Sequence, residues 1–197
     1  MADNNASQAG HSSLALARLG SPELLGKDGF SLSSAAFEDG EALDPCFTAD
    51  EEDAVAPPLE WTAPPKGTME LVLVVECPDA GGSEPACHWL VWGLPAQKGQ
   101  LLEGELPSFV GKNAQGNSEW LLPRQPEGES RAYMFQLFAL DLPLALTPGT
   151  DREALFKGME GHIVGMALLT GTYVSEGAED EGDWGDVELD NIDFDGN

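Results

Sequence analysis

The stretch LVLVV, residues 71–75, is the clearest structural signal in this sequence. It is short, continuous and rich in β-branched residues, which is typical of a strand buried on both faces. Gly165 and Gly171 interrupt a later apolar run, which indicates bulges or a close approach of another part of the chain. Several short strands joined by long connections predict a mostly β, antiparallel domain. The other expected strands cover residues 88–94, 133–140 and 163–174.

One helix is indicated late in the chain. Thr150 followed by Glu153 has the spacing of a capping box, in which each side chain satisfies a free backbone donor. Leu155 and Met159 lie four residues apart and share one face, and Gly161 can end the helix.

Composition and charge limit the classes of partner. The chain has 197 residues, 42% of them hydrophobic, which is enough for a real core. Its 9 basic and 35 acidic residues give a net charge of −26, so nucleic acid and anionic membrane surfaces are poor partners. No apolar run is long enough for stable membrane insertion. The first 13 residues lack the features of a secretory signal, so a cytoplasmic protein is expected.

The composition changes along the chain and predicts three parts. Residues 1–29 begin with a stretch rich in Ser, Ala, Asn and Gly, and we expect a flexible leader. Residues 30–174 carry the apolar runs and form the domain. Residues 175–197 hold ten acidic residues and no base, so this tail is expected to be poorly ordered. Its acidic-hydrophobic pattern could also dock on a basic groove of a partner.

Several standard site motifs are missing. There is no GxGxxG, Walker or GxSxG sequence, and the segment DFDG near the end lacks the downstream Glu of a calcium loop. Three cysteines without CxxC spacing argue against a zinc knuckle or a disulfide framework. No cofactor and no metal are therefore expected. What remains is Asp79 after one strand and His88 at the start of the next, a pair that can fix a tautomer or grip an anion.

Seven segments together resemble the phosphatidylethanolamine-binding protein family, in its bacterial Raf-kinase-inhibitor-like branch. The resemblance covers about residues 30–174 in consistent order. It implies an antiparallel β-sandwich-like fold with one or two small helices and a shallow pocket for phosphate, acetate or a phospholipid headgroup. Related bacterial proteins also imply a homodimer. The segments are SLSSAAFEDGEALDP (31–45), APPLEW (56–61), CPDA (77–80), HWLVWGLPA (88–96), GKNAQGNSEWLLPRQP (111–126), AYMFQLFALD (132–141) and MEGHIVGMALLTGTY (159–173).

The resemblance also implies a set of pocket residues, with departures. Cys77 stands where the family has its first Asp, and Arg131 stands where the family has a second His before Arg-Tyr. The glycine and the middle proline of the family's Gly-Pro-x-Pro-Pro loop are replaced, although Pro123 and Pro126 still match. Arg131 supplies a permanent charge that favours anions, or it pairs with Asp79 and plugs the cavity. The candidate ligand-binding residues are Cys77, Asp79, His88, Pro123, Arg124, Arg131 and Tyr133.

Three functions follow as hypotheses. The first is a non-enzymatic, regulatory module that binds a small anion or a phosphorylated headgroup. The second, also implied by the resemblance, is an inhibitor of kinases or proteases that acts on a protein target. The third is a thiol enzyme with Cys77 as nucleophile and His88 as base, which would need a depressed thiol pKa and an oxyanion hole. The sequence shows no oxyanion hole, so we expect no enzyme.

Overall fold

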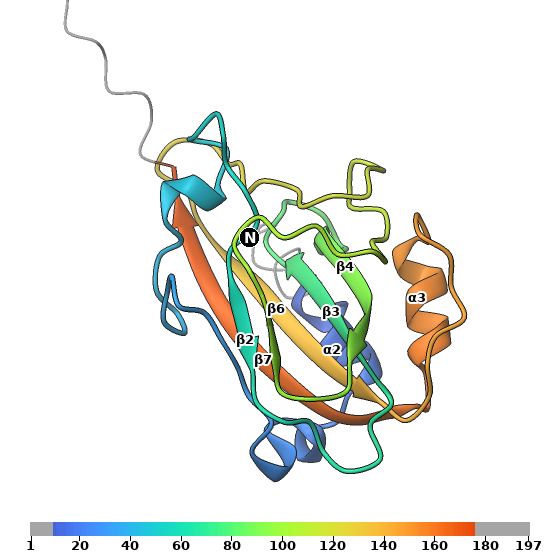
Figure 1. Cartoon of the computed structure of the whole chain (residues 1–197). Helices are drawn as coiled ribbons and strands as arrows, with labels where there is room; N and C mark the ends of the chain where they lie inside the picture. The colour runs from blue at the N-terminus through green and yellow to red at the C-terminus, as the bar shows by residue number, and fades with distance from the viewer. Residues whose placement is uncertain (1–9, 176–197) are drawn as a thin grey trace, which may run out of the picture.

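Two antiparallel sheets form the body of the protein, whose computed structural model describes residues 10–175 (Figure 1). The large sheet has the strand order β4-β3-β6-β7, and the small sheet has the order β1-β2-β5. The expected mostly antiparallel β fold with small helices is confirmed. The strands of the large sheet are β3 (Glu70–Cys77), β4 (Ala86–Pro95), β6 (Ser130–Leu140) and β7 (Ile163–Val174), and those of the small sheet are β1 (Leu32–Ser33), β2 (Leu59–Trp61) and β5 (Gly99–Leu101).

The large sheet is covered on both faces. All eight residues of β3 are buried, as the run LVLVV predicts, because this strand is central and lies between two apolar layers. One layer fills the space between the two sheets and includes Leu73, Phe135 and Trp89. The other layer lies on the opposite face, where Val74 and Phe138 pack with two helices. These helices are α2 (Ala15–Leu19) and α3 (Arg152–Met159), and short 3-10 turns span Pro22–Leu24, Lys27–Gly29 and Pro45–Phe47.

Helix α3 begins one residue later than the capping box predicts. Its N-cap is Asp151, whose carboxylate accepts a hydrogen bond from the Ala154 N–H at 2.8 Å. The Thr150 hydroxyl instead donates to the Thr147 carbonyl, so the predicted capping box is wrong. Asp and Thr are both good N-caps. Because the Thr150 hydroxyl is already bonded within the preceding turn, Asp151 takes the N-cap position. The predicted apolar face is confirmed by the burial of Leu155 and Met159.

Residues 10–29 are docked on the body, where the sequence suggested a flexible leader. Leu14 and Ala15 are buried, and the Ala15 N–H donates to the side chain of Glu76 on β3 at 2.8 Å. The segment is fixed both by hydrogen bonds of its backbone and by the packing of Ala15, Leu16 and Leu19 on the core, and the composition alone does not reveal these contacts. Residues 10–29 are thus docked rather than flexible, while the domain boundaries at residues 30 and 174 stay predictions. The acidic tail lies outside the described residues, except for its first residue.

The two glycines of β7 allow close packing, as predicted. A Cβ on Gly165 would lie 2.6 Å from the ring of Pro65, and a Cβ on Gly171 would lie 2.6 Å from Leu43. A one-residue register shift next to Gly165 shows that a bulge is also present there.

Candidate functional site

A β-bulge positions His88 at the end of the large sheet. Val75 pairs with Trp89 while the next residue, Glu76, pairs with Cys87, so His88 is an extra residue on β4. A bulge redirects the side chain of the inserted residue. The His88 ring therefore packs edge-on against Tyr133, with the ring centroids 4.9 Å apart.

Three of the predicted site residues form a buried cluster there. Cys77 ends β3, and Cys77, His88 and Tyr133 are each at least nine-tenths buried. Burial raises the pKa of the Cys77 thiol to about 11 and raises the pKa of Tyr133. It also lowers the pKa of His88, although the Leu121 carbonyl opposes this shift. The cluster is therefore neutral near pH 7, and its residues attract no anion through charge.

The loop after Trp120 closes over this cluster. The His88 Nδ1 lies 2.6 Å from the Leu121 carbonyl oxygen, so we assign its proton to Nδ1. Pro123 is buried, and its carbonyl accepts a bond from the Ala49 N–H. Pro126 in the same loop is exposed.

Gln125 stands where the family has its middle proline. Its amide donates to the backbone carbonyls of Glu129 and Tyr173, which anchors the loop to the end of β7. The sequence offered no signal for this role beyond the replacement of the proline.

Arg131 and Asp79 are near the cluster but do not pair with each other. Arg131 forms a 2.8 Å ion pair with Glu129, two residues before it in the chain. The Asp79 carboxylate lies 3.9 Å from the ring of His11 in the docked N-terminal segment. The alternative in which an Arg131–Asp79 pair plugs the pocket is therefore wrong, because each group has a different neighbour.

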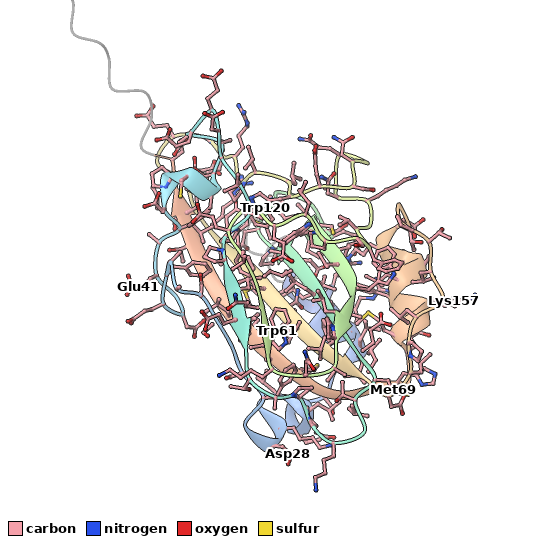
Figure 2. All side chains as sticks on the ribbon, viewed as in Figure 1. Asp28, Glu41, Trp61, Met69, Trp120 and Lys157 are labelled. Carbon is pink, nitrogen blue, oxygen red and sulfur yellow. The ribbon has the colours of Figure 1, made fainter. Side chains whose placement is uncertain are left out.

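Arg124 lines a groove of about 610 Å³ whose lining includes none of the three cluster residues. Trp89 and Trp120 contribute to the apolar wall of this Trp groove, with ring centroids 5.8 Å apart. The Trp120 ring also lies 6.1 Å from the His88 ring between centroids, so Trp120 borders both the groove and the cluster. Figure 2 shows Trp120 in the upper part of the molecule and Asp28 at the bottom. The other lining residues are Ala49, Ala54, Val55, Ala56, Gly104, Glu105, Leu106, Pro107, Val110, Gln115, Ser118, Glu119, Leu121 and Leu122.

Charge in the Trp groove is mixed. Arg124 is exposed, and it makes no ion pair with any described residue. The other three arginines, which also lie within residues 10–175, all pair with carboxylates. Glu105 and Glu119 contribute acidic groups to the same lining. Arg124 is among the residues predicted from the sequence, whereas no motif singled out Trp120.

The described part of the chain offers no donor set for a metal, since it contains no cluster of three or more His, Cys, Asp or Glu residues able to hold one.

The thiols give a direct test of the buried cluster. Cys77 and Cys87 are buried, whereas Cys46 is partly exposed. Because the reagent reaches only an accessible thiol, we expect Ellman's reagent at pH 8 to react with Cys46 alone in the native chain, and slowly, since burial raises the pKa of Cys46 to about 11 as well. All three thiols should react in guanidinium. The Cys46→Ser variant should show no native reaction, and a fast thiol in that variant would contradict the buried, protonated Cys77.

Known proteins share this architecture. Residues 33–174 match the family described as Phosphatidylethanolamine-binding protein. A UPF0098 protein from Methanothermobacter thermautotrophicus is 36% identical over 150 residues, which cover 73% of this chain and 97% of that protein. The crystal structure of the phosphatidylethanolamine-binding protein homolog CT736 from Chlamydia trachomatis matches with a TM-score of 0.68 and 30% identity, covering 73% of this chain and 96% of that chain. The chain therefore belongs to the phosphatidylethanolamine-binding protein family.

One relative bears on location. A Mycobacterium tuberculosis protein named as a lipoprotein, LppC, is 32% identical over 146 residues, which cover 73% of this chain and 71% of that protein. Within residues 10–175, no helix has the length and apolar character needed to cross a bilayer. A cytoplasmic location stays a prediction.

Proposed function

We propose that this protein is a non-enzymatic, regulatory binding module that holds a phosphorylated amphiphile in the Trp groove. The observation that carries the proposal is Arg124, an arginine without an ion pair among the described residues, on the rim of an aromatic groove. An exposed guanidinium can make bidentate contacts with phosphate. Membership of the family supports a binding role of this type.

The size and lining of the groove suit an amphiphile. About 610 Å³ lies within the range of small-molecule sites in proteins. Trp89, Trp120 and Val55 offer apolar surface for a hydrocarbon or glycerol portion. Such sites combine an apolar wall with a few polar groups that orient the ligand.

The charges favour a zwitterionic headgroup over a simple anion. Arg124 can bind the phosphate, while Glu105 and Glu119 can attract an ammonium group. In contrast, the buried cluster at His88 is neutral, and Arg131 already has a carboxylate partner. The Trp groove is therefore a better ligand site than the pocket that the family pattern implies.

Thermal unfolding tests the proposal. A short-chain phosphatidylethanolamine below its micelle concentration should raise Tm, because binding to the native state stabilises it. At a hundredfold excess over Kd the gain is about 2.7 kcal/mol, or roughly 5–10 °C for a domain of this size. Phosphorylethanolamine and inorganic phosphate should give smaller shifts, and a neutral sugar at equal ionic strength should give none.

Three variants locate the site. Arg124→Ala should remove most of the shift, whereas Lys157→Ala, which deletes a positive charge on the exposed face of α3, should keep it. Loss of the shift in Arg131→Ala but not in Arg124→Ala would place the phosphate at the His88 cluster instead and would contradict the assignment to the Trp groove. No shift with any of the lipid probes would reject the function itself.

A further inference from the structure

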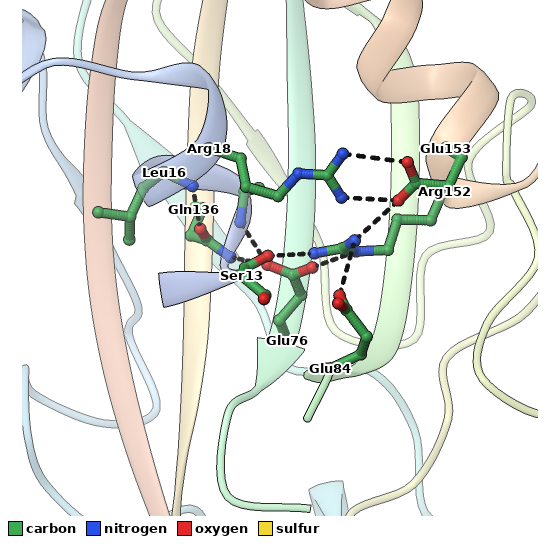
Figure 3. Close-up of polar contacts among 9 residues, drawn as sticks. Ser13, Leu16, Arg18, Glu76, Glu84, Gln136, Arg152 and Glu153 are labelled. Carbon is green, nitrogen blue, oxygen red and sulfur yellow. Dashed lines mark hydrogen bonds and ion pairs between the residues drawn. The ribbon is translucent and has the colours of Figure 1, made fainter. Parts of the chain in front are cut away.

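Two buried polar side chains of the large sheet bind the backbone of the N-terminal segment (Figure 3). Glu76 on β3 accepts the Ala15 N–H at 2.8 Å, and Gln136 on β6 accepts the Leu16 N–H at 2.7 Å. The Gln136 amide also donates to Glu76 at 2.8 Å, so the two acceptors are held in place. Both side chains are almost completely buried beneath the segment.

A third side chain completes the contact from the other side. Arg152, the first residue of α3, donates from Nε to Glu76 at 2.6 Å and from its terminal nitrogen to the Ser13 carbonyl at 2.5 Å. Three elements that are distant in sequence thus bind donors and acceptors of a short backbone stretch. Figure 3 shows these contacts converging between β3, β6 and α3.

The recognition is selective for side-chain size at one position. Ala15 has no exposed surface and lies in the same core cluster as Val74 and Phe138. Leu14 beside it is also buried. Ala17, which follows Ala15 by two residues on the same helix, is exposed. A long side chain therefore fits at position 17 but not at position 15. The bound pattern is a small residue flanked by leucines.

The binding residues and their occupant belong to different parts of the chain. Glu76, Gln136 and Arg152 lie within the region that matches the family, residues 33–174. The bound segment lies before it. Two 3-10 turns connect the bound segment to this region, and Gly26 and Gly29 adopt positive φ there. The segment is thus a tethered peptide on the face of a complete family domain.

We propose that the cleft formed by Glu76, Gln136 and Arg152 is a peptide-binding site. Its tethered occupant is residues 13–16, and it accepts from a partner protein a peptide with the same pattern, a small residue between leucines. This proposal does not rest on the ligand of the Trp groove. When residues 13–16 leave, water can reach the three polar side chains, so the empty cleft does not bury unpaired groups. An incoming peptide restores the same backbone hydrogen bonds.

Residues 13–16 compete with any free peptide for the cleft, and the test has to take this competition into account. A tethered occupant acts at an effective concentration in the millimolar range, so a free peptide binds the wild-type chain poorly. Weakening the tethered occupant without changing the cleft should reveal the site. The Ala15→Lys substitution does this in the full chain, and Ala17→Lys is a matched control with the same added charge.

The measurement is fluorescence anisotropy with a labelled peptide of residues 10–20. The Ala15→Lys chain should bind it saturably, on the order of tenfold or more tighter than the wild type or Ala17→Lys. A peptide with Lys in place of its own Ala15 should not bind. Absence of saturable binding to a folded Ala15→Lys chain, or equal binding to all three chains, would overturn the proposal. A wild-type dimer that Ala15→Lys abolishes would overturn the partner assignment in favour of exchange between two copies.

Hydrogen exchange on the wild-type chain provides a second test if Ala15→Lys does not fold. The amides of Ala15 and Leu16 should exchange through local opening, with a lower free energy than the amide of Leu73 in β3. Exchange of all three only through global unfolding would show that the segment cannot be displaced, which contradicts the proposal.

Discussion

Replacing Phe135 with alanine is expected to lower the free energy of unfolding by about 3–5 kcal/mol. The Phe135 ring has no exposed surface and lies between Phe37 and Trp120, at centroid distances of 5.6 and 5.9 Å. Its removal leaves a cavity beneath Trp120, so the wall of the Trp groove loses its support. Urea unfolding measures the first effect, and lipid binding well below Tm measures the second.

Phe138→Ala is the matched control for this prediction. Phe138 lies on the same strand and is equally buried, but it faces the helices on the other side of the sheet. The Phe138→Ala substitution should lower the free energy of unfolding by a similar amount and leave lipid binding intact. Equal loss of binding in both variants would show that Trp120 does not depend on Phe135 for its position.

Replacing Glu76 with alanine is expected to lower the free energy of unfolding by about 3 kcal/mol. The substitution leaves Arg152, whose side chain is only 14% exposed, without its buried partner. Breaking a buried ion pair in this way typically costs 3–5 kcal/mol. The lower figure applies because Arg152 keeps a 3.1 Å contact with Glu153, and water can enter once residues 13–16 lift away. The shift of the urea midpoint measures the loss.

Two further variants test whether the broken ion pair causes the loss of stability in Glu76→Ala. Glu60→Ala removes an exposed carboxylate from β2 and should change stability by less than about 0.5 kcal/mol. The double variant Glu76→Leu/Arg152→Leu should recover much of the loss, since an apolar pair leaves no buried charge. A loss below about 1 kcal/mol in Glu76→Ala would mean that the ion pair contributes little.

The strands could be predicted because their signals are local. The run at residues 71–75 is buried on both faces in the structure, and β7 has the bounds that its apolar run suggests, with close contacts at both of its glycines. The docked segment could not be predicted in this way. Its binding depends on Glu76 and Gln136, which are 61 and 120 residues away from their partners, and on backbone groups that every sequence has.

The candidate site was likewise predictable only in part. The family resemblance groups Cys77, His88 and Tyr133, and the structure places these three residues together at one end of the sheet. The resemblance does not reveal that the loop carbonyl of Leu121 closes over them, because this depends on tertiary packing. Nor does it show that Arg131 pairs with Glu129 while Arg124 faces a groove.

The indole N–H signals of the tryptophans test most directly whether the Trp groove binds the ligand. Titration of the ¹⁵N-labelled chain with short-chain phosphatidylethanolamine should shift the signals of Trp89 and Trp120, which line the groove. The signals of Trp61 in the small sheet and of Trp92 on the opposite face of the large sheet should stay in place. A saturable shift confined to Trp89 and Trp120 and lost in Arg124→Ala is the predicted result. Saturable binding that leaves both of these signals unmoved would contradict it.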